Sequence, residues 1–342
     1  MPVERGCALS APEEAAGFGS NDIPYRDGVL AWPTGDAAAE GLDPESLAQI
    51  ADDVGLSSTA SSFLVVRNGA LVAERYYHSG RADMAYNIHS VSKSLLSLIV
   101  GAAIADGAIP SVDTPIADLL PPDLAAEPGA DGLTVRHLLT MSGGVKGDSV
   151  ATIDAISGPS HPSQARAILQ LPRISEPGAE FSYYTGLTHL LAVVTANAVG
   201  SPLCEYAQKR LFGPMGITVD HWHSDLQGYF TGGTSMFITP REMARVGQFV
   251  LQRGKWGGRQ IVPASWIDEM TTQVWNLDTA TVDKPWGYGY LWWLDHDVGG
   301  YEVWNVWGYA GQEIFVVPAV KLVVVKTQRG RERVAPFRAS DR

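Results

Sequence analysis

Ser90-Val91-Ser92-Lys93-Ser94-Leu95-Leu96 is the stretch of sequence on which the interpretation of this chain depends. The apolar run over residues 95–100 predicts a helix that is buried on most sides and ends near Gly107. Because residues three apart lie on one helical face, we expect the Lys93 amine beside the Ser90 hydroxyl. An amine in that place can take the serine proton and make the oxygen a nucleophile.

The spacing has a second explanation, because a chain of this length contains about one Ser-x-x-Lys by chance. A serine that caps the helix, followed by a lysine on the helix surface, would give the same pattern. Two observations favour catalysis. This Ser-x-x-Lys is the only one in the chain, and its lysine falls one turn into an apolar helix, where a charge is costly without a partner.

Composition limits the classes of protein and partner. The 342 residues are 45% apolar, enough for one large domain or two closely connected ones. A net charge of −12 argues against nucleic acid and membrane surfaces as partners. Residues 1–20 lack the apolar core of a signal peptide, so we expect a cytoplasmic protein, with export as the alternative if a leader was removed.

The order of the predicted elements indicates the fold class. Asn68-Gly69 between apolar runs predicts a hairpin, and the last third predicts strands over residues 287–294, 301–306, 313–317 and 322–325. Consecutive hairpins form antiparallel sheets. We therefore predict an α/β (α+β) fold with a central antiparallel sheet, formed by both chain ends and flanked by helices, and an inserted mostly helical domain. The sheet domain comprises residues 1–88 and 236–342, the helical domain residues 89–235, and the active site lies in the cleft between them. An irregular segment is expected over residues 145–180.

Other chemistries find little support in the sequence. There is no Gly-x-Ser-x-Gly elbow, phosphate loop or dinucleotide fingerprint, so we expect no cofactor. His221 and His223 would share one face of a strand, but a third ligand is missing from the pattern. We therefore expect no metal either.

Several motifs occur in a fixed order along residues 41–327. They are the segments 90–94 (SVSKS), 135–144 (VRHLLTMSGG), 181–185 (FSYYT), 232–247 (GGTSMFITPREMARVG) and 308–318 (GYAGQEIFVVP). Together they resemble the serine β-lactamase-related hydrolases, which include class C β-lactamases, D-alanyl-D-alanine carboxypeptidases, family VIII-type esterases and 6-aminohexanoate-dimer hydrolase. The joint pattern is far more specific than any single motif.

The resemblance implies roles for individual residues. Ser90 would be the nucleophile, Lys93 and Tyr183 its proton relay, and the backbone N–H groups of Ser90 and Tyr309 the oxyanion hole. Burial lowers the pKa of a lysine, and we expect the nearby ammonium to lower the pKa of Tyr183. The two groups could then share one proton in a coupled titration.

The chain departs from the family pattern at two motifs. Thr185 replaces the asparagine of Tyr-x-Asn, and Val306-Trp307-Gly308 stands in place of Lys-Thr-Gly. Valine and tryptophan cannot bind a substrate carboxylate. We therefore expect a small neutral ester or amide as substrate, with Thr185, Trp307, Tyr309 and Gly311 as candidate substrate-binding residues. β-Lactamase or D-Ala peptidase activity is the alternative, and a sensor that is acylated without turnover is a hypothesis of another class.

Overall fold

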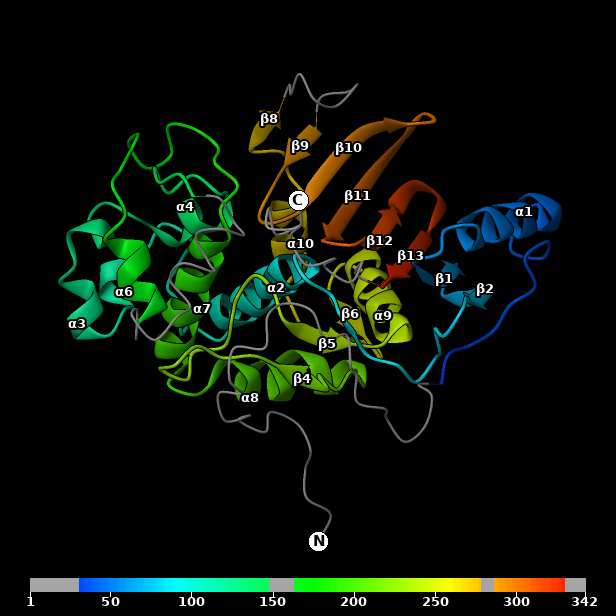
Figure 1. Ribbon diagram of the computed structural model, residues 1–342, viewed down its shortest axis with the longest axis horizontal. Coiled ribbons are helices and arrows are strands. Elements are labelled where there is room, and N and C mark those ends of the chain that lie inside the picture. Colours follow the sequence, from blue (N-terminus) through cyan, green and yellow to red (C-terminus); the bar gives the residue numbers. More distant parts are fainter. Residues whose placement is uncertain (1–30, 148–162, 278–285, 330–342) are drawn as a thin grey trace, which may run out of the picture.

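The computed structural model describes residues 31–147, 163–277 and 286–329 of the chain. Its main sheet has eight strands in the order β2-β1-β13-β12-β11-β10-β9-β8, and β3-β5-β4 and β6-β7 form two smaller sheets (Figure 1). The strands are β1 (Ala60–Arg67), β2 (Ala70–Tyr76), β3 (Tyr86–Asn87), β4 (His221–Trp222), β5 (Met236–Ile238), β6 (Lys255–Trp256), β7 (Arg259–Gln260), β8 (Trp275–Leu277), β9 (Trp286–Tyr288), β10 (Trp293–Val298), β11 (Tyr301–Gly308), β12 (Gln312–Val317) and β13 (Leu322–Gln328).

The helices lie mostly in the middle of the chain. The α-helices are α1 (Pro44–Gly55), α2 (Val91–Ala105), α3 (Pro122–Ala125), α4 (Val135–Leu139), α6 (Gln164–Leu169), α7 (Thr185–Val199), α8 (Leu203–Ala207), α9 (Pro240–Leu251) and α10 (Ala264–Met270). The short helices are η1 (Ile116–Asp118), η2 (Pro128–Ala130), η3 (Gln208–Phe212), η4 (Gly213–Met215) and η5 (Pro318–Val320), of which η3 is a π-helix and the others are 3₁₀ helices.

The main sheet joins the two ends of the chain, and this confirms the predicted fold class. Strand β1 pairs antiparallel with β2 through the turn at Asn68 and Gly69, whose φ angles are 50° and 87°. Positive φ at both positions is what a two-residue hairpin turn of type I′ requires. On its other edge β1 pairs antiparallel with β13, so that Val65 lies opposite Val324.

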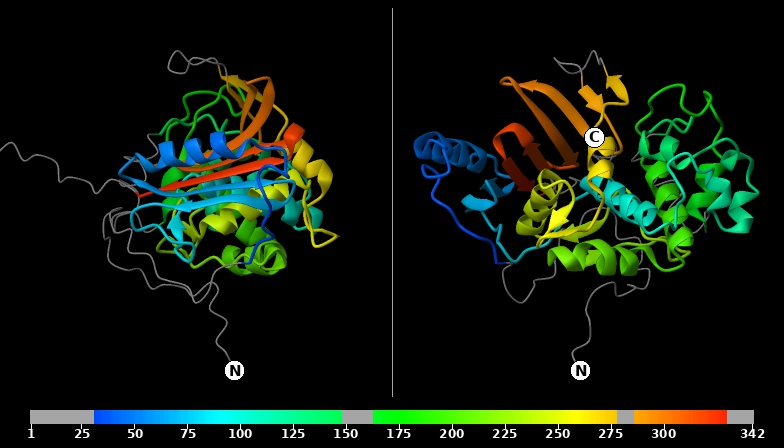
Figure 2. Two further views of the ribbon diagram at one scale, coloured as in Figure 1. Left: turned by 90° about the vertical axis from the view of Figure 1, so that its right-hand side faces the viewer. Right: turned by 180° about the vertical axis from the view of Figure 1, so that it is seen from behind.

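The two faces of the sheet are covered by different helices. Successive residues of a strand point to opposite faces. Phe63 and Val65 of β1 accordingly pack with Ala51 of α1, which lies across the outer face in the left view of Figure 2. Leu64 and Val66 belong instead to the main core, on the face covered by α9.

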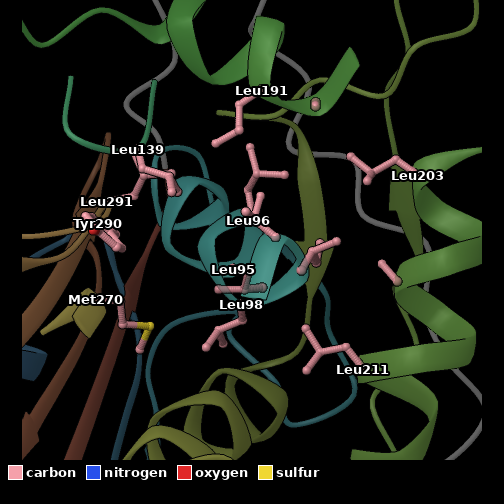
Figure 3. Close-up of a cluster of buried hydrophobic side chains, with 14 of the residues drawn as sticks. Leu95, Leu96, Leu98, Leu139, Leu191, Leu203, Leu211, Met270, Tyr290 and Leu291 are labelled. Carbon is pink, nitrogen blue, oxygen red and sulfur yellow. The ribbon is translucent and has the colours of Figure 1, made fainter. Parts of the chain in front are cut away.

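Helix α2 lies at the centre of that core, between the sheet and the helices α4 and α7 (Figure 1). Leu95, Leu96 and Leu98 are fully buried, as the apolar run predicted. Figure 3 shows them surrounded by side chains from α4, α7, α8, η3 and α10, among them Leu139, Leu191, Leu203, Leu211 and Met270. A helix enclosed in this way holds its first residues in a fixed position.

Two of the sequence-based boundaries were wrong. The strand predicted over residues 287–294 is broken into β9 and β10, because Leu291 has a φ of 62° and donates its N–H to Leu139 O of the helical region at 3.0 Å. The segment predicted to be irregular over residues 145–180 contains α6, while residues 148–162 lie outside the described part of the chain.

Among the described residues, no single helix has the length and apolar character needed to cross a membrane. The pair Thr185–Val199 and Leu203–Met215, bent by 74° at the break between them, meets that criterion jointly.

Candidate active site

Ser90 is the residue immediately before α2, and its side chain makes no capping hydrogen bond to the helix. Its hydroxyl is therefore not occupied by the structural role that a serine at this position usually has. Instead Lys93 Nζ lies 2.9 Å from Ser90 Oγ. The preceding residue, His89, has a φ of 47°, a left-handed conformation that is uncommon outside glycine and that recurs at functional sites.

Lys93 is only 1% exposed, so the alternative of a surface lysine is excluded. Its Nζ also donates a hydrogen bond to Gly233 O at 2.8 Å. Burial lowers the pKa of Lys93 from 10.5 to about 7, because the apolar surroundings disfavour the charged form. Near neutral pH a large fraction of this amine is therefore unprotonated and able to accept the proton of Ser90.

Tyr183 lies just before α7 and faces the same pair of groups. Lys93 Nζ is 5.2 Å from the centroid of its ring. Burial raises the pKa of Tyr183 to about 12, and a hydrogen bond with Ser90 lowers it by a smaller amount. Our prediction that the ammonium lowers this pKa was wrong, because the loss of solvation dominates. Tyr183 is thus a protonated phenol at neutral pH.

The end of β11 reaches the backbone of Ser90 from the other side. A Cβ atom on Gly308 would lie 2.4 Å from Ile88 O and 3.1 Å from Ser90 N, so only glycine fits there. This contact places Tyr309 next to the start of α2, and its role in the oxyanion hole stays a prediction. The Tyr309 side chain is 65% exposed, and its ring meets that of His89 edge-on at 5.5 Å.

His89 is not charged at neutral pH. Burial, and secondly the charge of Lys93, lower the pKa of His89 to about 4. Its ring contacts Tyr309, so we assign it to the packing of the β11 end.

An aromatic surface extends from Tyr183 along the sheet. Trp293 of β10 lies 5.7 Å from Tyr183 between ring centroids, and Trp307 of β11 stacks on Trp293 at 5.5 Å. The Trp307 side chain is 46% exposed. We refer to Tyr183, Trp293 and Trp307 as the aromatic wall. Trp307 was predicted from the sequence as a substrate-binding residue, whereas Trp293 was not. The neighbourhood of Trp293 and Trp307 depends on the register between β10 and β11, which the sequence does not give.

Comparisons with known proteins identify the family of this chain. The model of a family described as Beta-lactamase matches residues 52–340. The chain belongs to the beta-lactamase family. One relative is the 6-aminohexanoate-dimer hydrolase of Paenarthrobacter ureafaciens, which is 29% identical over 292 residues and covers 78% of this chain and 71% of its own length. With the Ser-x-x-Lys motif in place, this member of the family is a serine hydrolase.

Solved structures of the beta-lactamase fold superpose on most of the chain. A penicillin-binding protein homologue from Pyrococcus abyssi has a TM-score of 0.68 at 19% identity, over 85% of this chain and 74% of its own. EstCE1, described as a hydrolase with promiscuous acyltransferase activity, has a TM-score of 0.62 at 19% identity, over 83% of this chain and 92% of its own. At these identities the likeness concerns the fold alone.

The other residues that the sequence placed in the site differ in their neighbours. Thr185, where the family has asparagine, is buried at the first position of α7, and a Cβ atom on Gly233 would lie 2.7 Å from its Cγ2. Gly311 forms the turn after β11 with a φ of 85° and faces the side chain of Gln328. Val306 is buried. The roles of Thr185 and Gly311 in substrate binding stay predictions.

His221 and His223 lie together, with ring centroids 4.4 Å apart. Within the described ranges, no group of three or more His, Cys, Asp or Glu side chains is arranged to hold a metal ion.

Proposed function

We propose that this protein hydrolyses small neutral carboxylic esters or amides through an acyl-enzyme on Ser90. The observation that supports the proposal is the exposed ring of Trp307. In the alignment predicted from the sequence, Trp307 corresponds to a residue of the Lys-Thr-Gly motif that binds the substrate carboxylate in related β-lactamases and peptidases. An indole has no charge to offer an anion, whereas it packs well on an apolar acyl or alcohol group.

The proposed reaction begins with proton transfer from Ser90 Oγ to the neutral amine of Lys93, 2.9 Å away. Ser90 Oγ then attacks the substrate carbonyl, and the resulting oxyanion accepts hydrogen bonds from the backbone N–H groups of Ser90 and Tyr309. The N-terminus of α2, at Ser90, favours this negative charge.

Collapse of the tetrahedral intermediate breaks the bond to the leaving group, which needs a proton. Tyr183 is the donor in this proposal, because its raised pKa keeps the phenol protonated. The ammonium of Lys93 then gives its extra proton to the Tyr183 phenolate, which restores both the phenol and the neutral amine. A water molecule then attacks the acyl-enzyme by the same relay in reverse, releases the acid and restores Ser90.

Two relatives bear on the substrate class. One is named for hydrolysis of 6-aminohexanoate dimer, and the other is described as a hydrolase with promiscuous acyltransferase activity. Both names describe hydrolases, and the 29% identical relative supports hydrolysis here without naming the natural substrate.

The test compares p-nitrophenyl acetate with the β-lactam nitrocefin. We expect ester turnover that disappears in Ser90→Ala, and much slower turnover of nitrocefin. Nitrocefin hydrolysis at a comparable kcat/KM would reverse our assignment in favour of β-lactamase activity. Mass spectrometry in a single turnover examines the sensor hypothesis: a stable adduct on Ser90 that is never released would contradict hydrolysis.

A further inference from the structure

Lys93 is hydrogen-bonded to a segment whose residues take no part in the proposed reaction. Residues 223–235 connect β4 to β5, and Gly233 in this connection supplies the carbonyl that accepts the Lys93 hydrogen bond. We call residues 221–238 the glycine hairpin. Gly232 and Gly233 are wedged between helices: a Cβ atom on Gly232 would lie 1.9 Å from Thr188 O of α7, and one on Gly233 would lie 3.0 Å from Lys93 Nζ.

The glycine hairpin is held together by internal hydrogen bonds. Thr231 N donates to His223 O at 2.9 Å, and Thr231 O accepts from the Trp222 indole N–H at 2.8 Å. The hydroxyl of Thr231 donates to Thr234 O at 2.8 Å. These bonds give the hairpin its shape. The pairing of β5 with β3, in which Tyr86 lies opposite Ile238, fixes the β5 end of the hairpin but not the connection that carries Gly233.

A buried pair of side chains fixes the hairpin to α7. Asp225 Oδ2 accepts a hydrogen bond from His189 Nε2 of α7 at 3.0 Å, and the side chains of both residues are almost fully buried. Asp225 Oδ1 accepts two further bonds from the backbone N–H groups of Gln227 and Tyr229, both at 2.9 Å. A buried carboxylate is stable only when its oxygens are satisfied in this manner.

The packing of the hairpin against α7 is incomplete on this side. A cavity of about 20 Å³ lies between α6, α7 and residues 231–234, and is lined by Thr185 and His189. His189 Nδ1 is buried and has no hydrogen-bond partner in the part of the chain that the structure describes. The cavity accommodates about one water molecule, which would be a suitable partner for this nitrogen. Without the His189–Asp225 bond, the hairpin would have room to shift toward the cavity.

We propose that His189 and Asp225 are positioning residues for Lys93, because they fix the Gly233 carbonyl that orients the amine toward Ser90. The proposal rests on the proposed function, in which Lys93 is the base.

The test uses two substitutions of His189 in the full chain. His189→Leu keeps the volume and removes the donor, whereas His189→Gln keeps an N–H group at a similar reach. Thr195→Val is the matched control: Thr195 is also buried on α7, and its hydroxyl bonds to Leu191 O within the helix. For each variant, kcat/KM for p-nitrophenyl acetate is measured from pH 6 to 10, together with the Tm.

We expect His189→Leu to lose up to about a hundredfold in kcat/KM at pH 7, as a misplacement of about 1 Å does in other active sites. The loss should shrink toward pH 10. A displaced hairpin lets water reach Lys93, its pKa rises, and the amine becomes a competent base again only at higher pH. His189→Gln should recover most of the activity, and Thr195→Val should keep the wild-type profile.

The proposal is overturned if His189→Leu keeps the wild-type kcat/KM. It is also overturned if the loss in kcat/KM is the same at every pH and equals the loss in Thr195→Val when the two variants have the same Tm. If His189→Leu does not fold, Asp225→Asn takes its place in the experiment. The expected result is then a shift of the pH profile of kcat/KM to higher pH, and an unchanged pH profile would contradict the proposal. Ser90→Ala separates the two proposals. An inactive Ser90→Ala beside an unchanged His189→Leu contradicts the positioning role alone, whereas an active Ser90→Ala contradicts the proposed function.

Discussion

Replacement of Lys93 by methionine should stabilise the protein while it abolishes activity. The pKa of Lys93 falls from 10.5 to about 7 on burial. At about 1.4 kcal/mol for each pH unit, this interval corresponds to roughly 5 kcal/mol by which folding disfavours the ammonium. Between pH 7 and 10.5 the unfolded chain holds this proton and the native protein does not. The free energy of unfolding therefore rises with pH through that window, and the full penalty applies below pH 7.

Methionine has a similar length and no charge, so Lys93→Met removes the penalty. The substitution also leaves Gly233 O, which accepts from Lys93 Nζ at 2.8 Å, without its donor in a buried place. An unsatisfied buried acceptor costs about 1–3 kcal/mol. The net expectation is a gain of roughly 2–4 kcal/mol in the free energy of unfolding at pH 6–7. The gain should decline as the pH rises and vanish or reverse near pH 10.

Urea unfolding followed by tryptophan fluorescence at a series of pH values from 6 to 10 measures this difference. Ser90→Ala keeps the buried amine and should show the same pH dependence as the wild type. Lys326→Met removes a lysine that forms an ion pair with Glu313, and should bring no gain in stability. A difference between Lys93→Met and the wild type that does not change with pH would refute the reasoning, because the lysine would then have no depressed pKa.

Three further predictions concern activity. The kcat/KM for p-nitrophenyl acetate should rise through a pKa near 7 as Lys93 loses its proton, and should show no decline from Tyr183 up to pH 10, since its pKa is raised to about 12; a decline below pH 9 would contradict the assignment. Gly308→Ala, whose Cβ would meet Ile88 O at 2.4 Å, should lower kcat/KM by about a hundredfold with a smaller effect on Tm. Trp307→Ala should raise KM for phenylacetate esters by about tenfold while acetate esters change little; an equal change for both would argue against an aromatic wall that binds the acyl group.

The parts of the fold and site that could be predicted are those with a local signal. Ser90 and Lys93 are neighbours because a helix places residues three apart on one face. The turn at Asn68 and Gly69 follows from two residues that tolerate positive φ. The antiparallel sheet follows from hairpins in succession.

The parts that could not be predicted depend on contacts between distant segments. The direction of the Tyr183 pKa depends on how much of the phenol is buried, which several elements decide together. Trp293 joins the aromatic wall only through the register of β10 against β11. His189 and Asp225 are 36 residues apart in an arrangement without a sequence motif. The break at Leu291 depends on a hydrogen bond to Leu139 in the helical region.

The two departures from the family motifs, at Thr185 and Trp307, both bear on the charge of the substrate. By the alignment predicted from the sequence, Trp307 replaces a residue that binds the substrate carboxylate, and Thr185 replaces the asparagine of Tyr-x-Asn. The cation nearest the nucleophile is then Lys93 itself, with its amine 2.9 Å from Ser90 Oγ and about half protonated at pH 7. An anionic substrate beside Ser90 would draw Lys93 toward its charged form, raise its pKa and so remove the base that the reaction needs. A neutral substrate leaves the amine free to accept the proton. Under the proposed function, the burial that makes Lys93 a base at neutral pH would therefore also disfavour anionic substrates beside Ser90.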